Sequence, residues 1–136
     1  MQYAVLACRL IFGAWFVFNG LLYWFADHMP MGHHPVPIQL MEALLVSDLL
    51  LIVKIIEVAT GLMLLANVFT PLALVVAFPV TLVIAYNDLV LEWPLTRPLI
   101  GGGLTLLIHV FLLFAYLRFY APMLVFRAQP GPPIVK

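Results

Sequence analysis

Four long apolar stretches dominate the sequence, over about residues 3–25, 49–68, 72–90 and 98–120. Each is long enough to cross a bilayer, because a membrane-spanning helix needs about 20 mostly apolar residues. A helix also satisfies its own backbone hydrogen bonds, which lipid cannot do. We therefore predict an all-α fold: a polytopic membrane protein with a bundle of four transmembrane helices, forming a single domain over residues 1–120.

The low charge of the chain argues against most soluble classes. Only 9% of the residues are charged, whereas soluble domains have about 25%. The six basic and six acidic residues cancel, so we expect no nucleic-acid partner. Cys8 is the only cysteine, which excludes an intrachain disulfide, and we interpret it as a packing residue. The first stretch is not typical of a cleaved signal peptide, because no basic residue precedes Arg9.

Proline and glycine mark the segments between the spans. Residues 27–37 read DHMPMGHHPVP, a composition that interrupts a helix. Residues 38–46 follow as a short amphipathic stretch, for which we predict an interfacial helix in the first external loop. Pro71 suits the first turn of the third span, and Pro79 is expected to kink that span. Residues 121–136 are rich in proline and glycine and predict a flexible cytoplasmic tail.

The basic residues near the helix ends predict the orientation. With four spans both termini lie on one side, and that side carries Arg9, Arg118, Arg127 and Lys136, against Arg97 on the other. Basic residues favour the cytoplasmic side. We therefore expect cytoplasmic termini, in a bacterial inner membrane.

Several ionisable side chains fall inside the predicted spans, where each costs about 2.5–3.5 kcal/mol on insertion scales and needs a partner or a purpose. Two interpretations stay open for the charged residues of the first two spans. They neutralise one another as a structural lock, or they line a pocket for a polar head group or a proton route. The buried polar candidates are Arg9, Asn19, Lys54, Glu57, Asp88 and His109.

Glycines accompany these polar residues at helical spacing. In three of the spans a glycine lies on the same stripe as the polar group. Small residues let membrane helices approach closely, so the polar stripes are expected to face the bundle interior. The packing candidates are Gly13, Gly20, Gly61 and Gly102.

The histidines do not predict a cofactor. His109 has no companion histidine at its depth for haem, and we expect a neutral imidazole bonded to Glu57, Thr105 or a tyrosine. His28, His33 and His34 share the first loop and are weak metal candidates. Imidazole and carboxylate ligands would suit zinc or copper, but adjacent loop side chains need not converge. We therefore predict neither a metal site nor an intrinsic cofactor.

The segments RLIFGAWFVFNGLLYWF, KIIEVATGLMLLANVFTPLALVV and HVFLLFAYLRFYAPML resemble helices of the DoxX-like (DoxX/DoxD) membrane proteins. Arg9, Glu57 and Gly61 occupy the positions of the matching polar and close-packing residues. The chain departs from the pattern at Asn67, where a glycine usually ends the second helix, and in its long, histidine-containing first loop.

The resemblance implies a membrane subunit similar to DoxD of a thiosulfate:quinone oxidoreductase. On this basis we expect an accessory subunit or anchor of a larger membrane redox or energy-converting complex, or of an oligomer, beside quinone or lipid and without autonomous catalytic activity. Two alternatives remain: a transporter of small molecules or lipids that uses the polar interior, and a self-contained quinone-linked oxidoreductase.

Overall fold

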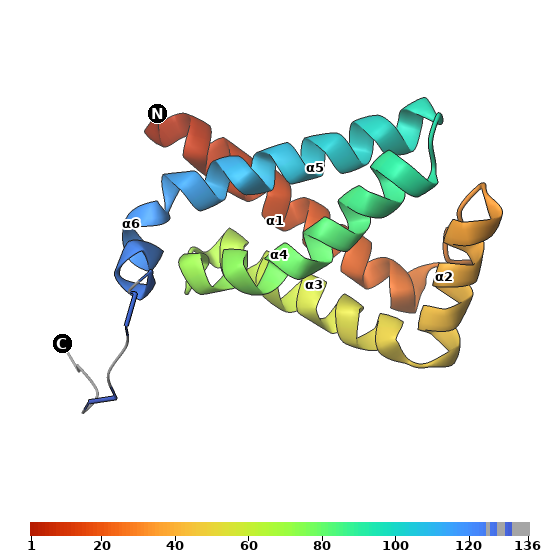
Figure 1. Cartoon of the computed structure of the whole chain (residues 1–136), viewed down its shortest axis with the longest axis horizontal. Coiled ribbons are helices and arrows are strands. Elements are labelled where there is room, and N and C mark those ends of the chain that lie inside the picture. Colours follow the sequence, from red (N-terminus) through yellow and green to blue (C-terminus); the bar gives the residue numbers. More distant parts are fainter. Residues whose placement is uncertain (125, 128–129, 132–136) are drawn as a thin grey trace.

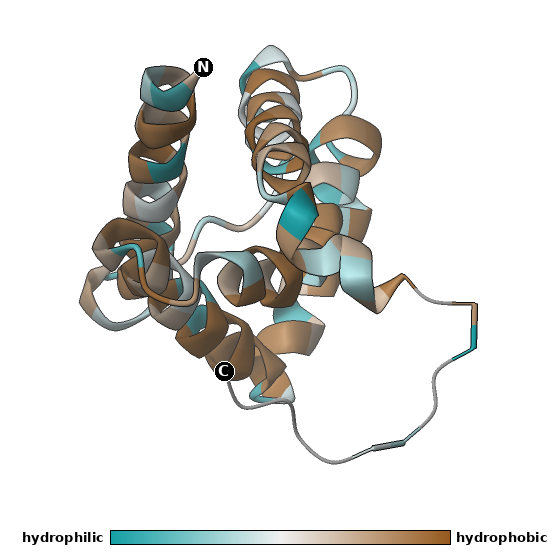
Figure 2. Ribbon diagram, turned by 90° about the vertical axis from the view of Figure 1, so that its left-hand side faces the viewer, coloured by the Kyte–Doolittle hydropathy of each residue, from teal (hydrophilic) through white to brown (hydrophobic). Residues whose placement is uncertain are grey.

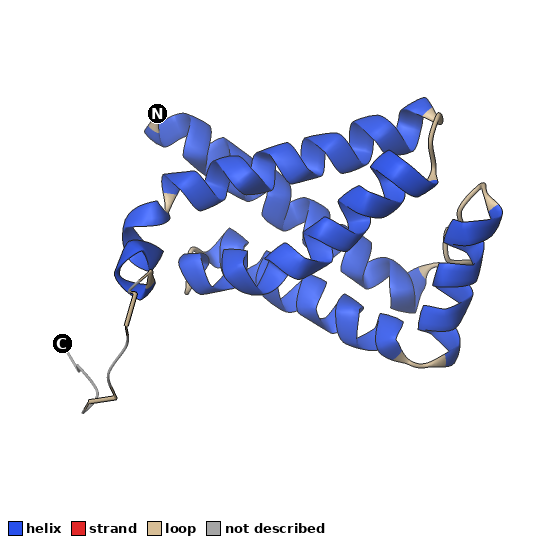
Figure 3. Cartoon of the chain, in the orientation of Figure 1, coloured by secondary structure: helices blue, strands red, loops and turns tan. Residues whose placement is uncertain are grey.

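Four long helices form the protein in a computed structural model, which describes residues 1–124, 126–127 and 130–131. The helices long and apolar enough to span a membrane are α1 (Gln2–Phe25), α3 (Leu49–Ala66), α4 (Thr70–Tyr86) with the π-helix η1 (Asn87–Leu91), and α5 (Thr96–Ala115). The shorter apolar helix α2 (Pro35–Val46) joins α1 to α3 (Figures 1 and 3). The predicted all-helical fold with four spans is confirmed.

Helix α2 begins three residues earlier than expected. The sequence placed residues 27–37 outside any helix because of their prolines, yet Pro35 and Pro37 both lie in the first turn of α2. A proline is tolerated there because the first backbone N–H groups of a helix have no intrahelical acceptor to lose. The loop between α1 and α2 is correspondingly shorter.

The last span ends before its predicted limit. Helix α5 runs from Thr96 to Ala115, and Tyr116 leaves the helical conformation, with φ −102° and ψ 12°. The short helices α6 (Leu117–Tyr120) and η2 (Ala121–Met123) follow. The predicted flexible tail, 121–136, therefore begins with a helical turn. Much of it, namely residues 125, 128–129 and 132–136, lies outside the described residues.

A tight turn joins α3 to α4. Asn67 ends α3 in the left-handed conformation at φ 56°, and Phe69 follows at φ 50°. Asparagine adopts this conformation more readily than most residues, so it replaces the glycine expected at a helix C-terminus. Pro71 lies in the first turn of α4, as predicted. Helix α4 continues through Pro79 and widens into η1 at Asn87.

Glycines set the antiparallel packing of α1 on α3. A Cβ atom added to Gly61 would lie 2.8 Å from the carbonyl oxygen of Gly13, and one added to Gly20 would lie 3.1 Å from that of Lys54. At both points backbone meets backbone, so neither helix can move aside for a side chain. The two contacts fix the register of the helices: two residues that face each other on α1 and α3 have numbers that sum to 74.

The buried core lies between the four long helices, and apolar side chains cover the outside. Brown, hydrophobic residues dominate these helices in Figure 2. Such an exterior suits lipid, and the residues it leaves exposed include Trp15, Phe18, Val76 and Leu107. The core cluster consists of Phe12, Phe16, Leu64, Ala73, Leu74, Ala77, Val80 and Leu112.

Candidate functional site: a cavity around the Lys54–Glu57 ion pair

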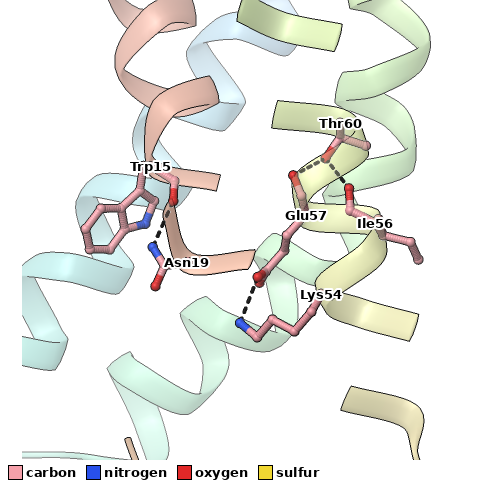
Figure 4. Close-up of polar contacts among 6 residues, drawn as sticks. All are labelled: Trp15, Asn19, Lys54, Ile56, Glu57 and Thr60. Atoms are coloured by element: carbon pink, nitrogen blue, oxygen red, sulfur yellow. Dashed lines mark hydrogen bonds and ion pairs between the residues drawn. The ribbon is translucent and has the colours of Figure 1, made fainter. Parts of the chain in front are cut away.

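A buried ion pair lies on one face of α3. The Lys54 ammonium donates to Glu57 Oε2 at 2.7 Å, and the two residues are 9% and 1% exposed. Their i, i+3 spacing puts both side chains on the same side of the helix. Thr60, one turn further along, donates to the backbone carbonyl of Ile56 (Figure 4). Two opposite charges at contact distance satisfy each other where water is scarce.

The pair forms part of the wall of a cavity of about 760 Å³. This volume is within the range of about 300–1,000 Å³ that is typical of small-molecule sites. Most of the wall is apolar, with side chains from α1, α2, α3 and α4, among them Phe16, Leu40, Val53 and Val80. The cavity thus joins apolar walls to one charged region, which suits an amphipathic ligand.

Two further polar residues that the sequence predicted to be buried, Asn19 and Asp88, line this cavity. Asn19 on α1 lines it opposite α3, and its amide N–H donates to the carbonyl of Trp15 at 2.9 Å (Figure 4). Asp88 lines it from η1 and accepts from the Asn87 amide at 3.1 Å. Gly102 on α5 makes room for Asp88, because a Cβ added there would lie 2.5 Å from that of Asp88.

A carboxylate that the sequence analysis did not single out also lines the cavity. Glu92 is 2% exposed and accepts two hydrogen bonds from His33, from the backbone N–H at 2.8 Å and from ring Nδ1 at 3.1 Å. The only hint in the sequence was an acidic residue directly after a span. Its partner lies 59 residues earlier, which no local pattern indicates.

The sequence model of the DoxX family matches residues 4–90. The chain belongs to the DoxX family. The match includes α1 to α4 and therefore the Lys54–Glu57 pair, and it ends before Glu92 and α5. No curated protein and no solved structure matches the chain.

Arg9 does not join the ion pair in this DoxX protein, contrary to one interpretation of the sequence. Its guanidinium donates instead to the side-chain oxygen of Asn67, which also accepts from the Thr70 hydroxyl at 3.1 Å. The register of α1 on α3 places Arg9 opposite Leu65. This is eight residues, or about 12 Å along the helix, from Glu57. Arg9 therefore fastens the turn between α3 and α4.

His109 also has other partners than those expected. Its Nε2 lies 2.9 Å from the carbonyl oxygen of Leu74, and its Nδ1 lies 2.6 Å from the Thr81 hydroxyl. A carbonyl can only accept, so Nε2 carries the hydrogen, and in the neutral ring Nδ1 accepts from Thr81. The ring is fully buried, with edge contacts to Phe12 and Phe78. It ties α5 to α4 in the core of the DoxX bundle.

The loop histidines have separate environments. His28 is exposed and contacts the carbonyl of Asp27, His33 is bound to Glu92, and His34 occupies the position directly before α2. Among the described residues no three His, Cys, Asp or Glu side chains gather as metal ligands would. Cys8 is half-buried and packs against the core cluster.

Proposed function

We propose that this DoxX protein is a small accessory subunit of a larger membrane redox complex, and that its cavity binds a lipid-soluble quinone. The observation that carries the proposal is the cavity itself, in which apolar walls surround a buried ammonium. A Lys ammonium has three donors, and Glu57 accepts from one of them. The others would serve a quinone carbonyl oxygen, while the apolar walls would hold the ring.

A quinone, when bound, carries electron pairs and protons between membrane complexes. The residues of this chain would position it: Lys54 as hydrogen-bond donor, Glu57 as the group that holds the Lys54 ammonium in place, and Asn19 as a second polar contact. The resemblance to a membrane subunit of a thiosulfate:quinone oxidoreductase favours the same ligand class. We further propose the bacterial inner membrane as its location, with both termini cytoplasmic.

The accessory role makes a spectroscopic prediction. Iron–sulfur clusters require several thiolates, and the sequence has one cysteine. Both ring nitrogens of His109 already have partners within the protein, which leaves neither free for haem. We expect no stoichiometric visible band from the purified protein, oxidised or reduced. A haem or flavin band would contradict the accessory role.

Quinone binding is testable through Trp15, which lines the cavity. With the other two tryptophans replaced by phenylalanine, in lipid nanodiscs, decylubiquinone should quench its fluorescence saturably. The double variant Lys54→Met/Glu57→Leu replaces the ion pair with apolar side chains and should bind more weakly, whereas Glu42→Leu, at an exposed site on α2, should bind normally. Unsaturable quenching, or wild-type affinity in the folded double variant, would refute the quinone site.

The partner complex requires a separate experiment. Mild detergent extraction from the native membrane, followed by subunit identification, should recover redox subunits in stoichiometric amounts. Recovery of the chain alone would refute the accessory role, whatever the result with quinone.

Transport is a second candidate, favoured by the three carboxylates of the cavity wall, Glu57, Asp88 and Glu92, which face a single lysine. Such a wall would attract a cationic solute. Uptake of an organic cation by proteoliposomes that contain this chain alone would support transport, and its absence would leave the quinone proposal as the better one.

A further inference from the structure

A loop closes one end of the cavity. Met29 to His33 line it there, and Glu92 fastens this segment through the two hydrogen bonds to His33. The loop packs so closely at Gly32 that an added Cβ would collide with the Glu92 carboxylate and the Pro37 ring. A ligand arriving from water at this end would have to break these contacts.

The side of the cavity between α2 and α4 is apolar and has no such hydrogen-bonded loop among the described residues that line it. An apolar groove follows the outer surface here, and its lining residues are Val36, Leu40, Leu82, Val83, Tyr86 and Leu91. Leu40 and Val83 line both the groove and the cavity. Two apolar side chains thus form the boundary between the cavity and the lipid-facing surface, and Val83 itself is 55% exposed.

We propose that the ligand enters the cavity sideways from the bilayer, between Leu40 and Val83, and that its apolar tail stays in the groove between α2 and α4. This inference rests on the proposed quinone site and names its ligand class more closely. The occupant is a membrane-dissolved molecule with a compact polar head and a single long apolar chain. The head reaches Lys54 and Glu57, and the chain lies on Leu82 and Tyr86.

The position of the tail can be mapped by photolabelling. A decyl-quinone with a diazirine at the end of its tail, bound to the protein in nanodiscs, should label residues 36–40 and 82–91. Excess decylubiquinone should abolish this labelling, because both molecules compete for the cavity. Labelling confined to residues 29–33 would refute the lateral route, as would labelling of all lipid-facing helices that excess quinone does not reduce.

A narrowed passage tests the route itself. Val83→Trp should slow the quenching of Trp15 by decylubiquinone by about tenfold or more, since a required rearrangement lowers association rates. Because this variant adds a tryptophan, quenching is compared with Val76→Trp, which adds the same residue seven positions earlier on the same exposed face of α4. Equal rates in the two variants would refute the passage.

The two proposals fail in different ways. If ubiquinone without a tail and decylubiquinone both bind saturably while the groove stays unlabelled, the quinone site stands and the lateral route is wrong. If neither quinone binds saturably, both proposals are overturned.

Discussion

Replacing Glu57 with leucine should strongly destabilise the protein. The change removes the carboxylate that lies 2.7 Å from the Lys54 ammonium and leaves a cation in a residue that is only 9% exposed. Breaking a buried ion pair in this way costs about 3–5 kcal/mol. Since 1.4 kcal/mol is a factor of ten, the ratio of folded to unfolded protein should fall by a factor between about 10² and about 4 × 10³.

The double variant Lys54→Met/Glu57→Leu separates the loss of one partner from the loss of the pair. With both charges replaced by apolar side chains no ion is stranded, so the double variant should be more stable than Glu57→Leu alone. Two measurements compare both variants with the control Glu42→Leu. One is unfolding in detergent, followed by the accessibility of Cys8, and the other is abundance of the protein in the membrane. If Glu57→Leu matched that control, the two charges would not depend on each other, and a hydrated cavity would explain the site better.

Three further predictions concern the packing, the core histidine and the orientation. Gly61→Ala places a Cβ 2.8 Å from backbone of the facing helix and should cost about 1–3 kcal/mol of stability. Gly101→Ala meets nothing within 4 Å and should be neutral or stabilising by up to about 1 kcal/mol in the same unfolding assay. His109→Leu removes the buried hydrogen bonds to the Leu74 carbonyl and the Thr81 hydroxyl and should lower the free energy of unfolding by about 1–3 kcal/mol, and an unchanged melting temperature would contradict the tie between α4 and α5. In a cysteine-free background, cysteines at His28 and Gly131 should react with an impermeant reagent from opposite sides of the membrane, and reaction from one side only would refute the proposed orientation.

The spans were predictable because their signal is a simple count. A run of about 20 apolar residues suffices to indicate each one, and all four appear in the structure. The boundaries were less predictable, since they depend on local backbone geometry. Helix α2 begins at Pro35, in a proline-rich segment that predicts a loop, and α5 ends before Tyr116, although the apolar sequence continues beyond it.

The site was predictable in part. Charged residues one turn apart on one helix, Lys54 and Glu57, pair by local geometry, which the sequence shows directly. Partners on different helices depend on the register between those helices. Once the contact of Gly13 with Gly61 is known, facing residues on α1 and α3 are those whose numbers sum to 74. Arg9 then faces Leu65 and lies far from Glu57. The sequence identified the packing glycines but did not indicate which of them face each other.

The partners of His109 and Glu92 were beyond sequence reasoning for the same reason. Thr81 lies 28 residues from His109, and His33 lies 59 residues from Glu92. Thr81 did not stand out in the sequence, because a threonine in a helix usually bonds to its own backbone. Only the packing of α4 against α5 brings its hydroxyl to the imidazole.

The π-helix at Asn87–Leu91 makes the direction of Glu92 tolerant to the loss of one residue. A π-turn holds one residue more than an α-turn in the same helix, and each helical residue rotates the following side chain by about 100°. Deleting Leu89 would restore an ordinary α-turn and leave Glu92 directed at His33, because the π-turn already holds one surplus residue. Deleting Leu89 and Val90 together would exceed that surplus and rotate Glu92 by about 100°, away from His33. Tolerance of the segment to deletion should therefore be stepwise: loss of Leu89 alone would preserve the contact of Glu92 with His33, while loss of Leu89 and Val90 together would open it.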